Sequence, residues 1–249
     1  MCRHLAYLGP PQPLARLLLE APHALVRQSW APRDMRGGGT INADGFGLGW
    51  YPGASRDPVR YRRATPMWSD LTLPGLAAAV ESGALLAAVR SATAGMPVVE
   101  TAVAPFADGP WLFSHNGVVA GWPGTVAKLA ERLDVTDLLT LAAPTDSALL
   151  WALLRDRLRA GVAMTAAVAQ TVAEVEAAAP GSRLNLLLTD GSTIVASTLG
   201  HSLAVREAGP AVLISSEALD DDRGWRPVPD RQIVTATTGR IVLTPLGEA

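Results

Sequence analysis

The sequence predicts an α+β fold in which helices cover antiparallel β-sheets. Strand-like segments occupy both ends of the 249-residue chain, and two long helical patterns, over 146–160 and 164–179, lie between them. The later strands follow one another closely enough to pair as antiparallel hairpins. Because 49% of the residues are hydrophobic, the chain can bury a large core, and we expect 2–249 to form a single domain.

The first forty residues predict a strand, a helix and a loop. Residues 3–8 form a strand pattern that ends at Gly9-Pro10-Pro11. Leucines at helical spacing behind Pro13 predict a helix over 13–20. The polar segment 33–40 contains three consecutive glycines, so we expect no regular element there.

The next segments predict three strands and one helix. In 44–51 glycine alternates with larger residues, which is typical of a strand that another backbone approaches closely. We expect a helix over 71–82 and a buried strand over 84–89. A further short strand over 111–115 is expected to open into Asn116-Gly117.

The C-terminal part follows the two long helices and predicts a series of strands. Asp190-Gly191 is a typical hairpin dipeptide, so the strands on either side of it are expected to pair. The expected strands are 184–189, 193–198, 203–207, 211–215, 232–237 and 240–244.

Composition and patterning argue against several classes of function. The net charge of -2 offers no basic surface for a nucleic acid, and no apolar run is long enough to span a membrane. The first residues lack the layout of a signal peptide, so we expect a cytoplasmic protein. The single cysteine and the scattered His4, His23 and His201 give no metal-ligand spacing, and the glycines match no nucleotide-binding motif. We therefore expect no metal and no cofactor.

Cys2 is the only cysteine, and it directly follows the initiator Met1. Removal of Met1 would place a thiol and a free α-amine on one residue, and both groups titrate close enough to neutral pH to react. Such a residue is a nucleophile that carries its own base. The alternative is that Cys2 is only a small buried hydrophobe, and its position alone does not decide between the two.

A cysteine that attacks a carbonyl needs donors for the oxyanion and groups that hold the substrate. Asn116 and Gly117 can supply a side-chain amide and a backbone N–H, with His115 as a support, although Asn-Gly is also a common turn. Arg90 follows an apolar strand and can bind a carboxylate, with Ser91 and Thr93 as nearby hydroxyls. The alternative for Arg90 is an ion pair within the domain.

Asp146 lies between Thr145 and Ser147 at the expected start of a helix. It can act as a fixed negative charge that accepts a substrate ammonium, or as an ordinary helix N-cap. A carboxylate site at Arg90 and an ammonium site at Asp146 would together recognise the head of an α-amino acid.

These residues, in this order, resemble the class II glutamine amidotransferases, which are N-terminal-nucleophile hydrolases that begin with cysteine. The matching segments are Cys2, Asp44-Gly45-Phe46-Gly47, Arg90-Ser91-Ala92-Thr93-Ala94-Gly95, His115-Asn116-Gly117 and Thr145-Asp146-Ser147. The resemblance implies a four-layer αββα sandwich with two mainly antiparallel sheets. It also implies Cys2 as the nucleophile with its α-amine as acid and base, and Asn116 and Gly117 as the oxyanion hole.

For the substrate, the resemblance implies that Arg90, helped by Thr93, binds the α-carboxylate of a γ-glutamyl group and that Asp146 binds its α-ammonium. Ser91 and Ala94 are smaller than the residues at these positions in many members, so the pocket wall is expected to differ. The start of the chain, the stretch 37–51 and the tail around 215–229 resemble one branch of the family. That branch removes glutamate from γ-glutamyl-hercynylcysteine sulfoxide in ergothioneine biosynthesis.

Two other functions remain open from the sequence. The chain ends where the glutaminase-like domain is complete, so it could instead be a glutaminase subunit that supplies ammonia to a separate partner synthase. A non-catalytic amino-acid sensor is a third possibility, which an intact Met1 would favour. The expected ligand in every case is a small molecule, and the sequence does not decide whether the chain forms a homo-oligomer.

Overall fold

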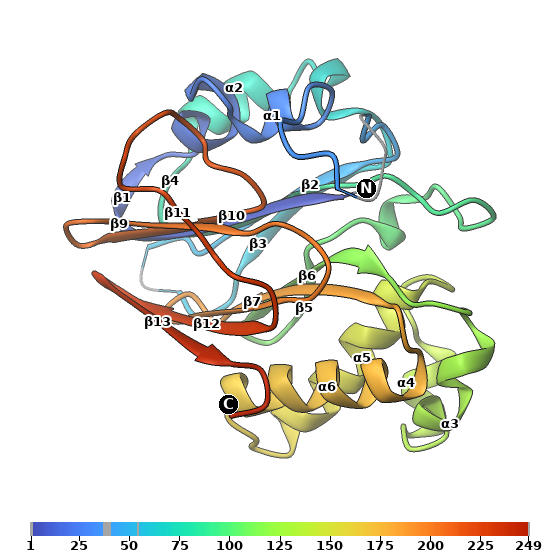
Figure 1. Ribbon diagram of the computed structural model, residues 1–249. Coiled ribbons are helices and arrows are strands. Elements are labelled where there is room, and N and C mark those ends of the chain that lie inside the picture. Colours follow the sequence, from blue (N-terminus) through green and yellow to red (C-terminus); the bar gives the residue numbers. More distant parts are fainter. Residues whose placement is uncertain (1, 37–40, 54, 249) are drawn as a thin grey trace.

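The computed structural model describes residues 2–36, 41–53 and 55–248, and in these ranges two β-sheets lie face to face between layers of helices (Figure 1). All strand pairs in the described ranges are antiparallel. The αββα arrangement expected from the resemblance is therefore confirmed.

The first sheet has the strand order β11-β9-β10-β1-β4-β2-β3. Its strands are β1 (Arg3–Pro13), β2 (Phe46–Trp50), β3 (Val59–Arg63), β4 (Glu81–Val89), β9 (Ala204–Ala208), β10 (Ala211–Ser215) and β11 (Arg226–Pro227). The second sheet has the order β13-β12-β8-β7-β6-β5. Its strands are β5 (Phe106–Asp108), β6 (Trp111–Val118), β7 (Arg183–Thr189), β8 (Ile194–Thr198), β12 (Gln232–Thr237) and β13 (Arg240–Pro245).

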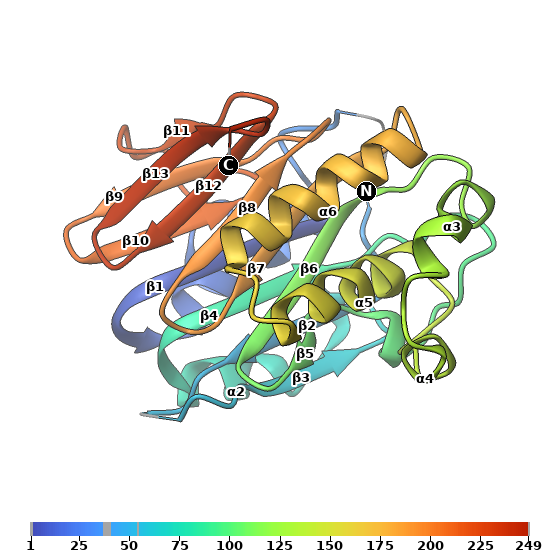
Figure 2. The same ribbon diagram turned by 90° about the horizontal axis from the view of Figure 1, so that it is seen from below.

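Helices cover the outer face of each sheet. The first sheet is covered by the short helices η1 (Arg16–Glu20), α1 (Leu25–Gln28) and α2 (Leu73–Ala79). The second is covered by α5 (Asp146–Arg159) and α6 (Met164–Ala178), which lie across its strands (Figure 2). The remaining short helices are η2 (Met67–Ser69), η3 (Glu100–Ala102), η4 (Gly124–Val126), α3 (Ala127–Ala130) and α4 (Val135–Leu139).

The core consists of three apolar layers, one between the sheets and one under each helical layer. Strand β1 shows how the sequence builds them. Leu5 and Tyr7 pack toward the helices, whereas Ala6 and Leu8 pack toward the second sheet, because neighbouring side chains of a strand point to opposite faces. The small alanines on the inner face allow the two sheets to approach closely.

The first strand and the two N-terminal helices differ from the sequence prediction. Strand β1 does not end at Gly9-Pro10-Pro11 but continues to Pro13, with a shift of register against β4 between Leu8 and Gln12. Such an irregularity removes the need for ladder hydrogen bonds that proline cannot donate. The helix expected over 13–20 is only the five-residue η1, and the one expected over 71–82 ends at Ala79, because β4 begins at Glu81.

The most informative difference concerns β6, which does not end at His115. The strand continues to Val118, and Asn116 and Gly117 pair with Asn185 and Leu184 of β7. The alternative that Asn116-Gly117 is a plain turn is therefore wrong.

The strand expected over 84–89 begins three residues earlier, at Glu81, and the other expected strands and the two long helices are present with shifts of at most two residues at their ends. The Asp190-Gly191 hairpin joins β7 and β8. Strands β3 and β5 and several short helices were not expected. Part of the glycine-rich segment 33–40, residues 37–40, lies outside the described residues. Among the helices in the described ranges, none is long and apolar enough to cross a membrane.

Candidate active site

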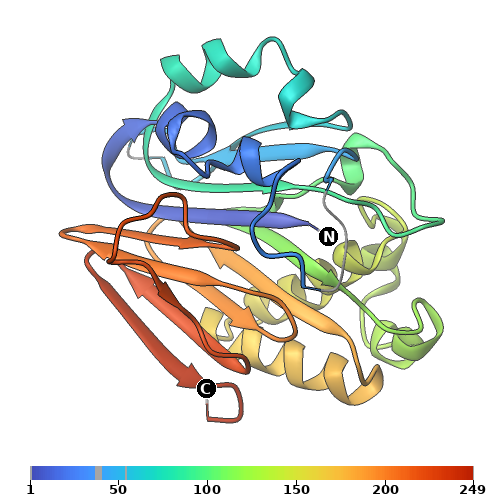
Figure 3. The ribbon, with the colours of Figure 1, turned by 45° about the horizontal axis from the view of Figure 1, so that its top comes forward.

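Strand pairing brings Cys2 and Arg90 together. Arg3 at the start of β1 pairs with Val89 at the end of β4, so the residues next to them, Cys2 and Arg90, lie at the same edge of the sandwich (Figure 3). The Sγ atom of Cys2 donates to the carbonyl oxygen of Ser91 at 3.7 Å. Two hollows at this edge share Cys2, Arg90 and Ser147 in their walls.

One of these hollows contains most of the site that the sequence predicts. Its walls include six of the eight candidate residues, namely Cys2, Arg90, Ser91, Thr93, Gly117 and Asp146. His115 lines the neighbouring hollow, and Asn116 lines neither. Each hollow has about 20 Å³ of free space, room for about one water molecule, so a larger ligand requires the walls to move apart.

Arg90 is available to a ligand although its side chain is largely buried. Its Nη1 donates to the carbonyl oxygen of Pro97 at 2.9 Å. In residues 2–36, 41–53 and 55–248 no carboxylate lies within ion-pair distance of Arg90. The described part of the chain therefore does not show the internal ion pair that was the alternative for this residue. A guanidinium has five N–H donors, which leaves donors for a carboxylate.

Asp146 is the first residue of α5 and not its N-cap. The cap is Thr145, whose hydroxyl accepts from the backbone N–H of Ala148 at 3.2 Å. The carboxylate of Asp146 accepts from the N–H groups of Val119 at 3.0 Å and Ser147 at 2.7 Å. It is thus a fixed negative charge with two backbone donors, and a carboxylate has acceptor positions beyond those two.

His115 connects β6 to α5 and to the neighbouring strand. Its Nε2 lies 3.0 Å from the carbonyl oxygen of Arg183, which can only accept, so Nε2 carries the proton. In the neutral ring, Nδ1 then accepts from the hydroxyl of Ser147 at 2.9 Å. Through these contacts His115 holds this part of β6 against α5 and β7.

Gly117 is required by a close approach of two backbones. A Cβ at this position would lie 1.8 Å from the carbonyl oxygen of Arg183 and 2.5 Å from Nε2 of His115. A larger residue at position 117 would therefore push β6 away from β7. The backbone at this position would then no longer lie in the wall of the hollow.

Asn116 is fully buried between the two sheets, on the face of β6 opposite His115. Its Nδ2 lies 3.5 Å from Oγ of Ser216, at the limit of a hydrogen bond, and its Oδ1 has no hydrogen-bond partner among the described residues. The amide group therefore has unused hydrogen-bonding capacity near the start of β1, where Ser216 also accepts from the N–H of His4 at 3.0 Å.

The Asp44-Gly45-Phe46-Gly47 segment holds the arginine segment in place, a role that the sequence did not predict. The carboxylate of Asp44 accepts from the N–H of Ala92 at 2.7 Å. Its backbone N–H donates to the carbonyl oxygen of Arg90 at 3.0 Å, and the N–H of Arg90 donates to Gly45 at 2.7 Å. The motif could be recognised in the sequence, but its function depends on this long-range pairing.

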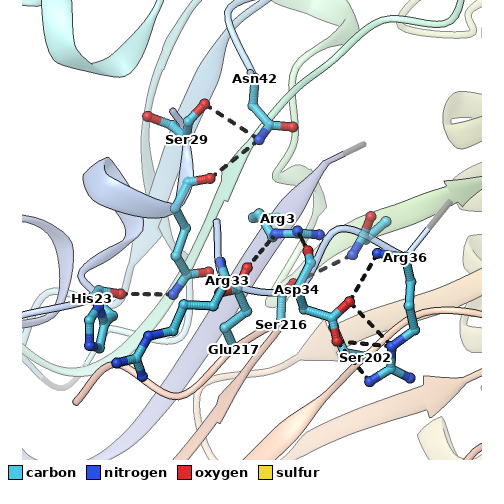
Figure 4. Close-up of polar contacts among 12 residues, drawn as sticks. Arg3, His23, Ser29, Arg33, Asp34, Arg36, Asn42, Ser202, Ser216 and Glu217 are labelled. Atoms are coloured by element: carbon cyan, nitrogen blue, oxygen red, sulfur yellow. Dashed lines mark hydrogen bonds and ion pairs between the residues drawn. The ribbon is translucent and has the colours of Figure 1, made fainter. Parts of the chain in front are cut away.

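A buried ion pair fixes the start of β1 next to Cys2 (Figure 4). Nε of Arg3 lies 2.9 Å from Oε1 of Glu217, and Nη1 donates to the carbonyl oxygen of Cys2 at 3.4 Å. Arg3 also donates to the carbonyl oxygen of Asp34, and Glu217 accepts from the N–H of Arg33 at 2.7 Å. Burial lowers the pKa of Arg3, which the charge of Glu217 opposes. This network could not be predicted, because its members are far apart in the sequence.

His4, near the start of β1, faces β6 of the other sheet, and its Nδ1 lies 3.2 Å from Oγ of Ser114. Burial, with the charges of His115 and His201, lowers the pKa of His4 to about 3. Burial, with the charge of Arg183 as the next cause, lowers the pKa of His201 to about 4. Both rings are therefore neutral in the folded protein at neutral pH.

The two histidines predict a loss of stability on acidification. The unfolded chain binds a proton at each histidine near pH 6.5, but the folded chain does so only near pH 3 to 4, so unfolding is favoured as the pH falls through this window. We expect the free energy of unfolding to fall by about 3 kcal/mol between pH 6.5 and 5, because the slope for each histidine starts at half of its full value of roughly 1.4 kcal/mol per pH unit at pH 6.5 and approaches that value below it. Urea unfolding at several pH values measures this, and the variant His201→Gln should show about half the dependence. An equal dependence in the variant and the parent would contradict this account.

Among the described residues no three His, Cys, Asp or Glu side chains are grouped so that they could hold a metal ion.

Comparisons with known proteins relate the chain to one family. The family model described as class II glutamine amidotransferases matches residues 21–211. The γ-glutamyl-hercynylcysteine sulfoxide hydrolase of Mycolicibacterium smegmatis is 41% identical over 248 residues, which cover 99% of this chain and all of the relative. The protein of the same name from Mycobacterium tuberculosis (strain CDC 1551 / Oshkosh) is 40% identical, with 100% of this chain and 98% of the relative covered.

The fold also matches solved structures. The structure of a class II glutamine aminotransferase domain protein from Silicibacter pomeroyi superposes with a TM-score of 0.68, covering 98% of this chain and 99% of the other, at 23% sequence identity. At this identity the likeness concerns the fold alone.

Proposed function

Since the chain belongs to the class II glutamine amidotransferases, we propose that it is a hydrolase that cleaves the γ-glutamyl amide bond of γ-glutamyl-hercynylcysteine sulfoxide and releases glutamate. The two mycobacterial relatives carry this activity in their names and align with the chain over its whole length. We take 2–249 as one catalytic domain in the cytoplasm, since a free thiol nucleophile suits a reducing compartment.

The observation that carries the proposal is the common hollow of Cys2, Arg90 and Asp146. A positive group without a carboxylate partner in the described ranges, a fixed carboxylate and a thiol all line this one hollow. This arrangement suits a γ-glutamyl group, whose α-carboxylate and α-ammonium carry opposite charges at one end and whose amide lies at the other. Thr93 and Ser91 would add hydroxyl contacts to the same head group.

In the proposed first step, the free α-amine of Cys2 accepts the thiol proton and the sulfur attacks the γ-carbonyl carbon. The carbonyl oxygen becomes an oxyanion, which Nδ2 of Asn116 and the backbone N–H of Gly117 would stabilise. The long contact from Asn116 to Ser216 makes its N–H available at little cost. The carbon–nitrogen bond then breaks, and the protonated α-amine gives its proton to the departing nitrogen.

In the second step, water hydrolyses the γ-glutamyl thioester on Cys2. The α-amine accepts a proton from the water, the new carbon–oxygen bond forms, and the sulfur leaves and regains the proton. The products are glutamate and the free amine of hercynylcysteine sulfoxide. The chemistry requires Met1 to be absent, and Met1 itself lies outside the described residues.

Other side chains would act by position. Asp44 and Gly45 hold the backbone on both sides of Arg90, and the ion pair of Arg3 and Glu217 holds the carbonyl of Cys2. The small hollows indicate that binding opens the site. The loop between β4 and η3 extends away from the body of the molecule (Figures 1 and 3), and its residue Thr93 lines the hollow of Cys2.

A comparison of substrates tests the proposed function. The purified protein should release glutamate from γ-glutamyl-hercynylcysteine sulfoxide with a kcat/KM at least 100-fold above that for glutamine, because only the first offers contacts beyond the scissile bond, and about 2.7 kcal/mol of such contacts gives this ratio. A strong preference for glutamine would instead favour an ammonia-supplying subunit. Absence of glutamate release from either substrate would exclude both enzymatic functions.

A further inference from the structure

A further hollow, lined by arginines and called here the charged hollow, lies beside the two hollows that contain Cys2. It has a volume of about 210 Å³ between β3, β5, α5 and the loop that precedes α5. Its walls carry three arginines, which are Arg60, Arg62 and Arg155. Most of the remaining lining is apolar and includes Phe106 and Ala148.

Two of the three arginines lack a carboxylate partner in the described part of the chain. Arg155 is paired with Asp137 at 2.6 Å. Arg60 and Arg62, two residues apart on one face of β3, donate instead to the carbonyl oxygens of Pro105 and Val103, each at 3.2 Å. Within the described ranges, no carboxylate is within ion-pair distance of either.

The two free charges also disfavour each other. Partial burial lowers the pKa of Arg60, and burial followed by the charge of Arg60 lowers that of Arg62, against a weaker opposite effect of Glu100. Arg60 is exposed and Arg62 half-buried, so a solute can reach both. A bound anion would remove the repulsion between them.

The charged hollow adjoins the hollow that is lined by both Cys2 and His115. Phe106 lines both hollows. Residues 102–104 line the hollow of Cys2 and His115, and the carbonyl oxygens of Val103 and Pro105 accept hydrogen bonds from Arg62 and Arg60 of the charged hollow. On α5, Ser147 belongs to the Cys2 hollow and the next residue, Ala148, to the charged one. From Ser147 to Arg155 the helix rises about 12 Å.

We propose that Arg60 and Arg62 bind a carboxylate of the leaving group, on the side of Cys2 away from the glutamyl head. This inference rests on the proposed function and names the contacts that select its substrate. Hercynine is a trimethylated histidine and keeps its carboxylate, which lies at the far end of the leaving group from the scissile amide. Arginine pairs bind carboxylates well, because their N–H groups match the geometry of the two oxygens. Glutamine, whose leaving group is ammonia, has nothing to place there.

The test compares Arg60→Gln, Arg62→Gln and the double variant with Arg63→Gln, which removes a charge from the other face of the same strand. The ratio of kcat/KM for γ-glutamyl-hercynylcysteine sulfoxide to that for glutamine should fall by roughly 10-fold or more in each single variant, mainly through KM, because each change removes a charge-assisted hydrogen bond of about 1.5–3 kcal/mol. Arg63→Gln should leave the ratio within about twofold. Thermal unfolding identifies variants that fail to fold. If the double variant fails to fold, the two single variants alone test the proposal.

An unchanged ratio in the single variants would overturn the proposal, as would an equal loss on both substrates. If the parent protein does not hydrolyse the sulfoxide substrate at all, the proposed function fails and this inference with it. If the parent does so and the ratio is unaffected by the arginines, only the leaving-group site is wrong.

Discussion

Replacing Cys2 with alanine is expected to reduce turnover of the γ-glutamyl substrate by at least about 10⁴-fold. Loss of a catalytic nucleophile in a site of this kind removes the covalent route, and what remains comes from binding and the oxyanion hole. The variant keeps the α-amine, Arg90 and Asp146, so it should still bind substrate. Glutamate release measures the first effect, and isothermal calorimetry with uncleaved substrate measures the second.

Cys2→Ser is the matched control for this prediction. It keeps a nucleophilic atom at the same position with a much higher pKa, so its activity should lie between those of the parent and the alanine variant. Turnover by Cys2→Ala within tenfold of the parent would exclude the thioester mechanism, whatever the other variants showed.

The second large effect is expected at Asn116. Replacement with alanine should lower kcat by about 10²- to 10³-fold with a small change in KM, because an oxyanion donor acts in the transition state more than in the bound substrate. Steady-state kinetics on the sulfoxide substrate separate the two parameters. Asn116 is buried and lines neither of the two hollows at the site, so this prediction depends on its N–H turning from Ser216 to the substrate.

Ser216→Ala tests whether Asn116 acts only through its neighbour. The serine hydroxyl lies 3.5 Å from Nδ2 of Asn116, and its removal should cost less than about tenfold in kcat if the amide serves the oxyanion directly. A matching loss in both variants, or a loss in Asn116→Ala that appears in KM alone, would assign Asn116 a structural role.

The sequence predicted the regular parts of the fold because their patterns are local. Helices α5 and α6 and the strands around Asp190-Gly191 carry periodicity and turn residues that decide their structure without help from distant residues. Strands β3 and β5 carry no such local pattern. The first consists mostly of arginines around Tyr61 and the second has three residues, so neither has an apolar alternation that a sequence pattern could detect.

The differences in β1 and β6 have one physical cause. Proline and Asn-Gly favour turns by local propensity, but pairing with neighbouring strands outweighs that preference when the backbone has partners. Gly117 has such a partner in the carbonyl of Arg183, which it approaches so closely that only glycine fits. The dipeptide that looked like a turn is thus a strand residue pair at the candidate site.

The candidate site could be predicted in part for the same reason. Cys2 precedes β1, Arg90 follows β4 and Asp146 is the first residue of α5, so their positions at element ends could be read from the sequence. The supporting contacts could not. Asp44 bonds to Ala92 and Glu217 pairs with Arg3 across long stretches of chain, and only the sheet pairing brings these residues together.

Intact-mass spectrometry before and after treatment with a glutamine analogue that alkylates active-site thiols is the most direct test of the central claim. If Cys2 with its free α-amine is the nucleophile, we expect a chain that lacks Met1 and gains one adduct, located on Cys2 by peptide mapping. Activity should be lost in proportion to labelling. An active chain that retains Met1, or one inactivated by an adduct elsewhere, would contradict it.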